Sequence, residues 1–474
     1  PTAKSSRGAV RRFNKGDAKI PVAETSTLPN IFGTARWGII DEWRRPKPEF
    51  WNVKKAYSPV RLLETQVPQF EPGNPISLPV QNRFDHTTLD QITMRVSYDG
   101  KTQELACPPI EPHKKGTIAL PAADWKAGTE VAVSFLDRSK KLIDDYRIAL
   151  GIPAKPEAPA LEGAPEVVEA NGQITIQGEE FAIVIDRATG LIQSIKHGEA
   201  SIPFLGPIPH IFKLEEFHLM GINPDIGKTP SVITKTVTYE SPFLDAWKLK
   251  DIRIEKKVFA VVVHITGSLE AFNVEYTYSI AANGRMDISY QFKNIPPLDT
   301  TGKLPRTGEP VNLEVGIKFQ TSDQFDRLQW DKKSYWSSYP EGHLGSAKGS
   351  IELFSADKPA WAQKPTQPWN KDVWDFYLMG WPVPEGKLLT YEASAAKQAL
   401  RTYNLDDREA NLALTVYGDG ETTTARYGQF KDNQYYLYLL DTLDYALKWG
   451  NYSANNRPEP NHQGVARLSF EELD

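Results

Sequence analysis

Aromatic side chains stand next to carboxylates and a histidine in two short segments of the sequence. Flat aromatic rings pack against the C–H faces of a polyhydroxylated ring such as a pyranose, and the neighbouring polar groups exchange hydrogen bonds with its hydroxyls. This composition predicts substrate-binding residues. The predicted residues are Asp41, Glu42, Trp43, Trp336, Tyr339, Glu341 and His343.

Each segment also has a structural interpretation, and the sequence leaves both open. Asp41 and Glu42 can instead cap a helix and pair with Arg44 and Arg45. The aromatics around Trp336 can pack in a core or between domains, which is where we expect Trp330.

No residue pattern identifies a metal site, a disulfide or a catalytic pair. His210 and His218, with Glu215 and Glu216 between them, alternate across a predicted strand instead of converging on one point. Cys107 is the single cysteine, which excludes an internal disulfide and a cysteine-based metal cluster. Residues 369–375 are rich in tryptophan, asparagine and aspartate, and for them we favour a domain interface over hydroxyl contacts. The catalytic residues are left unknown.

The overall composition is that of a globular protein with more than one domain. The chain has 474 residues, of which 40% are hydrophobic and 24% charged, and its formal net charge is −5. No apolar run is long enough to span a bilayer, so we predict no membrane segment. Lysines and arginines are interleaved with acids and form no basic patch, so we predict no nucleic-acid partner.

Short alternating apolar runs dominate the sequence and predict an all-β fold. Residues 1–30 lack periodicity and predict an extended arm, whereas 49–57 have helical spacing after a proline pair. Residues 63–151 predict a small β-sandwich. The proline-rich stretch 152–167 predicts a stiff linker, and the strand patterns of 168–474 predict one large two-sheet sandwich.

Three segments resemble the C-terminal half of a family 2 glycoside hydrolase of the β-galactosidase type. WGIIDEWRRPKPEFWNVKKAYSPVRL, at 37–62, is similar to the junction after the last strand of the catalytic TIM barrel, so 31–62 would be the barrel's end. Residues 84–151, with Asp99-Gly100 and LIDDYRIALG, resemble the family's immunoglobulin-like domain. Residues 173–470, with GEEFAIVIDRATGLIQSI, resemble its small-chain domain, a mutarotase-like supersandwich.

The resemblance implies that this chain shapes a sugar pocket whose chemistry is done elsewhere. The family's acid/base and nucleophile glutamates lie on earlier barrel strands, so we expect a fragment or small subunit that is inactive alone. A barrel-bearing partner chain or N-terminal fragment and an oligomeric assembly are then expected. The family often uses Mg²⁺ and Na⁺, with ligands mostly on that other part, so no cofactor is expected in this chain.

The sugar, the compartment and two other functions stay open. The loop 334–343 and the segment 451–455 depart from the galactose-type pattern, which leaves the sugar and linkage undecided. Cytoplasm and periplasm are equally compatible with the sequence. A non-catalytic carbohydrate-binding or scaffolding protein is one alternative. A supersandwich with its own mutarotase- or lyase-like site, using Glu341 and His343 as acid and base, is the other.

Overall fold

A computed structural model of the chain places most of its strands. The described residues are 39–40, 44–46, 48–151, 157–178, 180–214, 236–238, 246–269, 272–295, 313–333, 339, 343, 345–355, 388–389, 396–429, 434–442 and 460–473. Several predicted features lie outside these residues. They are the arm 1–30, Asp41, Glu42, Trp43, His218, Glu215, Glu216, Trp336, Glu341 and the segments 369–375 and 451–455.

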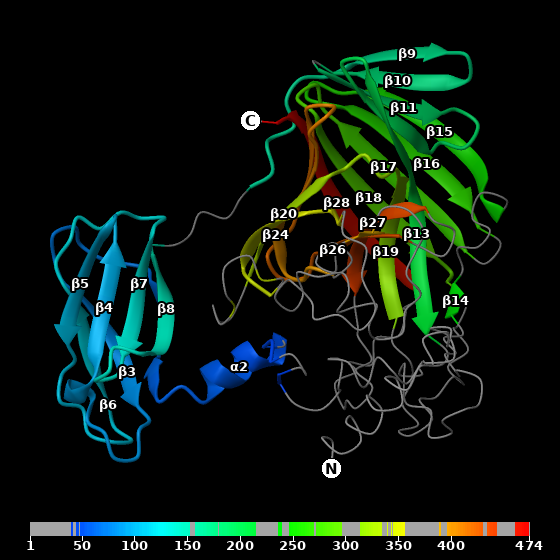
Figure 1. The fold of residues 1–474 in the computed structure, drawn as a ribbon. Coiled ribbons are helices and arrows are strands. Elements are labelled where there is room, and N and C mark those ends of the chain that lie inside the picture. Colours follow the sequence, from blue (N-terminus) through cyan, green and yellow to red (C-terminus); the bar gives the residue numbers. More distant parts are fainter. Residues whose placement is uncertain are drawn as a thin grey trace, which may run out of the picture. The chain divides into compact units, whose positions relative to one another are not determined.

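The chain divides into two compact units, and the smaller comprises residues 46–151 together with Tyr339 among the described residues. Its strands form a three-stranded sheet, β1-β3-β6, and a five-stranded sheet, β2-β8-β7-β4-β5 (Figure 1). Buried side chains from both sheets share one core. The elements are α2 (Pro48–Ala56), β1 (Val60–Leu62), β2 (Gln66–Val67), β3 (Ile76–Asn82), β4 (Thr93–Tyr98), β5 (Lys101–Ala106), β6 (Lys115–Leu120), β7 (Glu130–Leu136) and β8 (Leu142–Leu150).

Helix α2 matches the helix predicted from 49–57, and a buried lysine attaches it to β8. The Lys55 ammonium lies 2.7 Å from a carboxylate oxygen of Asp144 and donates to the Asp145 carbonyl at 2.6 Å. The same Nζ lies 3.6 Å from the centroid of the Tyr146 ring. Since the Lys55 and Asp144 side chains are only 8% and 3% exposed, each charge depends on the other.

The thiol of Cys107 belongs to the core of the smaller unit, and burial raises its pKa to about 11. At pH 8 only about one thiol in a thousand would be ionised, and the thiolate is the reactive form. We therefore predict that Cys107 reacts slowly with Ellman's reagent in the native chain and rapidly in urea, as measured by thionitrobenzoate release. A native rate equal to that of free cysteine would contradict this placement.

The larger unit is a sandwich of two extended antiparallel sheets (Figure 1). The first sheet has the order β26-β27-β19-β13-β12-β11-β10-β9, with β14 on β13. Its strands are β9 (Glu166–Ala170), β10 (Gln173–Gln177), β11 (Phe181–Asp186), β12 (Ile192–His197), β13 (Ala200–Leu214), β14 (Thr236–Thr238), β19 (Leu313–Thr321), β26 (Thr424–Gln429) and β27 (Tyr435–Thr442).

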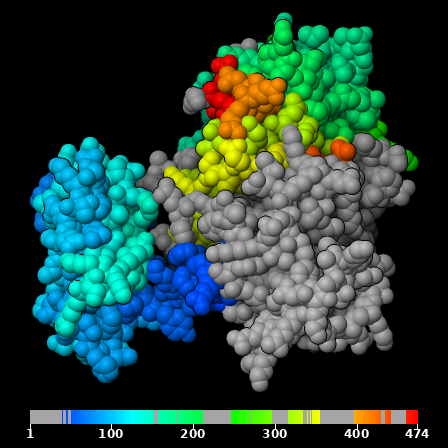
Figure 2. All heavy atoms as spheres, in the orientation of Figure 1, coloured from blue at the N-terminus to red at the C-terminus, as the bar shows by residue number. Residues whose placement is uncertain are grey.

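The second sheet has the order β15-β16-β17-β18-β28-β25-β24-β20-β21, so the late strand β28 lies in its middle. In Figure 2 the yellow surface of the stretch that holds β20 adjoins the orange surface of the stretch that holds its partner β24. The strands of the second sheet are β15 (Lys248–Lys256), β16 (Val261–Ser268), β17 (Asn273–Ile280), β18 (Arg285–Lys293), β20 (Arg327–Lys332), β21 (Lys348–Glu352), β24 (Leu400–Asp407), β25 (Leu412–Tyr417) and β28 (Asn461–Glu472). A short pair, β22 (Phe354–Ser355) and β23 (Leu388–Leu389), is separate.

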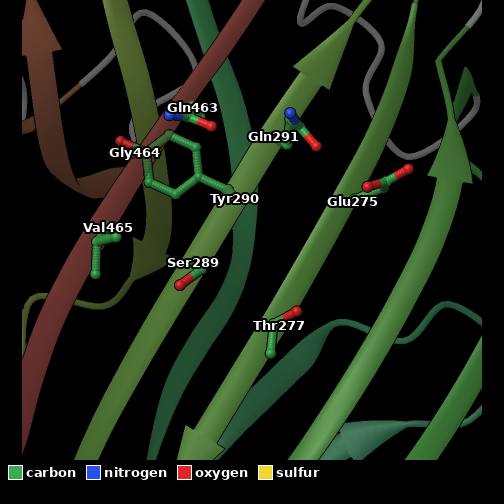
Figure 3. A pocket seen from close by; sticks show the side chains of 8 residues that line it. All are labelled: Glu275, Thr277, Ser289, Tyr290, Gln291, Gln463, Gly464 and Val465. Atoms are coloured by element: carbon green, nitrogen blue, oxygen red, sulfur yellow. The ribbon is translucent and has the colours of Figure 1, made fainter.

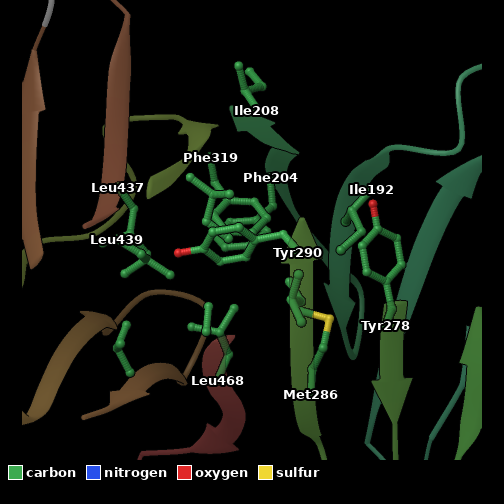
Figure 4. Close-up of a cluster of buried hydrophobic side chains, with 14 of the residues drawn as sticks. Ile192, Phe204, Ile208, Tyr278, Met286, Tyr290, Phe319, Leu437, Leu439 and Leu468 are labelled. Carbon is green, nitrogen blue, oxygen red and sulfur yellow. The ribbon is translucent and has the colours of Figure 1, made fainter. Parts of the chain in front are cut away.

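Inward-facing side chains of the two sheets form one apolar core (Figure 4). Phe204 of β13 stacks on Phe319 of β19, with ring centroids 4.3 Å apart. Phe470 of β28 meets the Phe204 ring edge-on at 6.0 Å, which joins the sheets. Trp330 is 3% exposed and belongs to this core, as predicted. The all-β prediction is confirmed for the described residues.

The predicted linker is partly structured. β9 begins at Glu166, inside the proposed stretch 152–167, and the Asn283 side-chain amide donates to the Ala160 carbonyl at 2.8 Å. Since proline removes a backbone donor but not an acceptor, such a stretch can still pack through its carbonyls. Among the described helices, none combines the length and apolar character needed to cross a membrane.

Candidate functional site

The structure describes two of the predicted site residues and places them in different units. The Tyr339 hydroxyl accepts a hydrogen bond from the Asn52 amide of α2 at 2.9 Å. His343 belongs to the larger unit, is 6% exposed, and its Nδ1 accepts from the Gly345 amide at 3.0 Å. This bond holds the imidazole against its own turn.

A polar groove lies on strands β17, β18 and β28 of the second sheet, with a cavity volume of about 490 Å³ (Figure 3). Antiparallel register aligns its side chains in two rows across the strands. Alternation along each strand puts these rows on one face of the sheet and turns the Tyr290 side chain to the core. The rows are Glu275, Gln291 and Gln463, and Thr277, Ser289 and Val465.

The chemistry of this groove is that of a hydroxyl-binding surface. Gln291 and Gln463 each offer an amide that both donates and accepts, and Ser289 offers an exposed hydroxyl. The Glu275 carboxylate is held by the Lys293 ammonium at 2.6 Å, which fixes an acceptor at one end. Several donors and acceptors close together fit vicinal hydroxyls better than an apolar ligand.

A hydrogen-bonded cluster on the core side supports the floor of the groove. The Tyr290 hydroxyl donates to Asp441 of β27, and His462 Nε2 lies 2.8 Å from the same carboxylate oxygen. Burial, reinforced by the Asp441 carboxylate, raises the pKa of Tyr290 well above its usual value, so the phenol stays a neutral donor. Asp441 belongs to the first sheet and the other two residues to the second, so the cluster ties the sheets together.

Gly464 makes room for this cluster. It lies directly opposite Tyr290 in the β18–β28 pair. A Cβ atom at this position would come within 3.0 Å of Tyr290 and of an Asp441 carboxylate oxygen. Because glycine has no side chain, the Tyr290 ring can lie over β28 at this position, and its hydroxyl can reach Asp441.

A second concentration of polar and aromatic groups lies on the first sheet, but its ring faces are occupied by the protein. The Lys318 ammonium lies 4.5 Å from the Tyr436 ring centroid, and the Arg426 guanidinium lies 4.3 Å from that of Tyr438. His210 meets the Tyr438 ring edge-on at 5.1 Å. Since cations of the chain already cover these rings, the cluster supports packing more than ligand binding.

Sequence reasoning missed the groove and the cluster beneath it. Their residues come from strands up to 190 positions apart, such as Glu275 and Val465, and polar residues on the outer face of a strand are ordinary. The signal available for the first sheet was the run YYLYLL at 435–440, whose unbroken apolar character indicates a strand covered on both faces. It does not identify a ligand.

Comparison with known proteins gives weak and partial similarity to β-galactosidases. No protein-family model matches the chain. It is 22% identical over 341 residues to a β-galactosidase of Lactobacillus delbrueckii subsp. bulgaricus, covering 68% of this chain and 31% of that protein. The β-galactosidase of Priestia megaterium is 21% identical over 338 residues, with 66% and 30% covered. The chain therefore spans about a third of the length of these curated relatives.

Among solved structures, a galactose 1-epimerase from Lactobacillus acidophilus matches with a TM-score of 0.32 and 9% identity, covering 65% of this chain and 98% of that one. A putative aldose 1-epimerase from Escherichia coli K12 matches with a TM-score of 0.29 and 9% identity, covering 63% and 98%. TM-scores of this size do not establish a shared fold or function.

Proposed function

We propose that this chain is the β-sandwich part of a β-galactosidase-type glycoside hydrolase, either a C-terminal fragment or a small subunit, and that its polar groove contacts the carbohydrate. The observation that carries the proposal is the pair of cross-strand rows that presents Gln291, Gln463 and Ser289 beside the Glu275 carboxylate. This set suits sugar hydroxyls, and the partial similarity to two β-galactosidases supports the same ligand class.

Under this proposal the chemistry is done outside this chain. The acid/base and nucleophile glutamates would lie on a barrel-bearing partner or on a segment beyond this sequence, together with the ligands for Mg²⁺ and Na⁺. The smaller unit would correspond to the family's immunoglobulin-like domain, and 31–62 to the end of the barrel. A barrel end needs the rest of the barrel to cover its apolar side, so we propose a heteromeric or nicked assembly.

A non-catalytic carbohydrate-binding protein is the second candidate. The observation that favours it is that all side chains of the groove come from one sheet of this chain. The two candidates differ in one measurable property. Under the first proposal, a mixture of this chain and the barrel part of a β-galactosidase should hydrolyse a nitrophenyl galactoside. Under the second, the mixture should show no hydrolysis that depends on this chain.

Truncating the groove amides is expected to weaken oligosaccharide binding. Gln291→Ala and Gln463→Ala each remove a side chain that exchanges hydrogen bonds with a hydroxyl, and one such interaction accounts for about a tenfold change in Kd. Isothermal titration of the full chain with a panel of galacto-, xylo- and arabino-oligosaccharides measures the change.

The matched control is Gln173→Ala, which removes an exposed glutamine from β10 on the other sheet. It should leave Kd unchanged. Binding that is equally strong in the two groove variants would place the sugar elsewhere, and absence of binding to every oligosaccharide up to millimolar concentration would contradict the carbohydrate site itself.

A further inference from the structure

Three side chains that are far apart in the sequence converge at one end of the larger sandwich. Glu180 precedes β11, His197 ends β12, and Glu472 ends β28. Their candidate ligand atoms all lie within 4.8 Å of one another. Register explains the first two, because His197 pairs with Phe181 and so lies beside Glu180. Glu472 reaches them from the second sheet.

The histidine is oriented as a metal ligand is. His197 Nδ1 lies 3.3 Å from the Ala410 carbonyl oxygen. A carbonyl only accepts, so this nitrogen carries the proton and Nε2 keeps its lone pair. Metal-binding histidines commonly donate their second ring N–H to a backbone carbonyl in this way, which fixes the tautomer and the ring orientation.

The two carboxylates leave a negative charge to be neutralised. Within the described part of the chain, Glu180 and Glu472 form no ion pair with a lysine or arginine. Both are exposed, so small side-chain rotations can shorten the separations to those of ligands about 2.0–2.2 Å from a common ion.

We propose that Glu180, His197 and Glu472 bind a divalent transition-metal ion of the Zn²⁺ class. One imidazole and two carboxylates suit Zn²⁺ better than Ca²⁺ or Mg²⁺, which prefer oxygen ligands alone. The ion joins strands of the first sheet to the end of β28 in the second. It therefore stabilises the sandwich by an amount that rises with the logarithm of the free ion concentration above its Kd, independently of carbohydrate binding.

Zn²⁺ titration of the EDTA-treated full chain tests the site by calorimetry and thermal unfolding, with Co²⁺ absorption as a report on ligand geometry. We expect one ion per chain with a micromolar Kd and a rise in Tm. His197→Gln and Glu472→Gln should each weaken Zn²⁺ at least tenfold and abolish the Tm rise. Glu472 is exposed, so its variant keeps the fold even if the His197 variant does not.

The matched controls are His113→Gln and Glu169→Gln, which change an exposed histidine and an exposed glutamate elsewhere in the chain. Both should bind Zn²⁺ as the unchanged chain does. A Kd above 1 mM, or Zn²⁺ binding that survives both site substitutions, would overturn the proposal. Neither result bears on the oligosaccharide groove, so the two proposals fail separately.

Discussion

Gly464→Ala is expected to destabilise the larger unit by about 3 kcal/mol or more. The added Cβ would lie within 3.0 Å of Tyr290 and of Asp441, which are hydrogen-bonded to each other across the two sheets. The ring or the strand must move, and either movement breaks that bond and leaves the buried Tyr290 hydroxyl without its acceptor, while Asp441 keeps its contact with His462. Urea unfolding, with hydrogen exchange of peptides from β18 and β28, measures the loss.

Gly428→Ala is the matched control, because a Cβ at that strand position meets no atom closer than 3.7 Å. Its effect should be near zero. A double-mutant cycle adds a second test. Tyr290→Phe should lower the free energy of unfolding clearly less in the Gly464→Ala background than in the unchanged chain, because the hydrogen bond to Asp441 is already lost there. If the two substitutions lowered the free energy of unfolding additively, Gly464 would not be needed for the Tyr290–Asp441 hydrogen bond.

Lys55→Ala is expected to destabilise the smaller unit by about 3–5 kcal/mol, because it leaves the Asp144 carboxylate buried without its counter-charge. The attachment of α2 to β8 through the Asp145 carbonyl and the Tyr146 ring is lost in the same step. The buried thiol of Cys107 provides a selective probe, since the chain has no other cysteine. We expect Ellman labelling to accelerate by two or more orders of magnitude in this variant.

Removing both charges separates the contribution of the Lys55–Asp144 ion pair from that of side-chain packing. The double variant Lys55→Met with Asp144→Ala should be more stable than Lys55→Ala alone, because no unpaired charge remains in the core. Lys141→Ala, which truncates an exposed lysine next to β8, serves as the control and should leave the labelling rate unchanged. Equal labelling rates in Lys55→Ala and the unchanged chain would refute the assigned role of the ion pair.

The sequence predicted local structure well but did not identify the polar groove. Proline placement and 3.6-residue spacing located α2, and Asp99-Gly100 located the β4–β5 turn, where both residues have positive φ. These features depend on neighbours in the chain. The groove depends on β28 pairing with β18, which brings Gln463 beside Gln291 across more than 170 positions. Alternation shows which face a side chain occupies but not which strand lies next to it.

The predicted sugar-binding residues also depend on contacts between distant parts of the chain, which the sequence alone does not show. Their composition suggested one site, and of these residues the structure describes Tyr339, in the smaller unit, and His343, in the larger. Asp41, Glu42, Trp43, Trp336, Tyr339, Glu341 and His343 all stay predictions.

The central position of β28 has a consequence for synthesis of the protein on the ribosome. Among the described strands, the other eight of the second sheet precede β28 in the chain, and β28 is the strand that joins β18 to β25. Until β28 leaves the exit tunnel, the nascent chain carries two half-sheets with bare edges, which are the surfaces on which unfinished β proteins aggregate. We expect such ribosome-bound intermediates to depend on chaperones, and premature termination before residue 461 to yield insoluble protein.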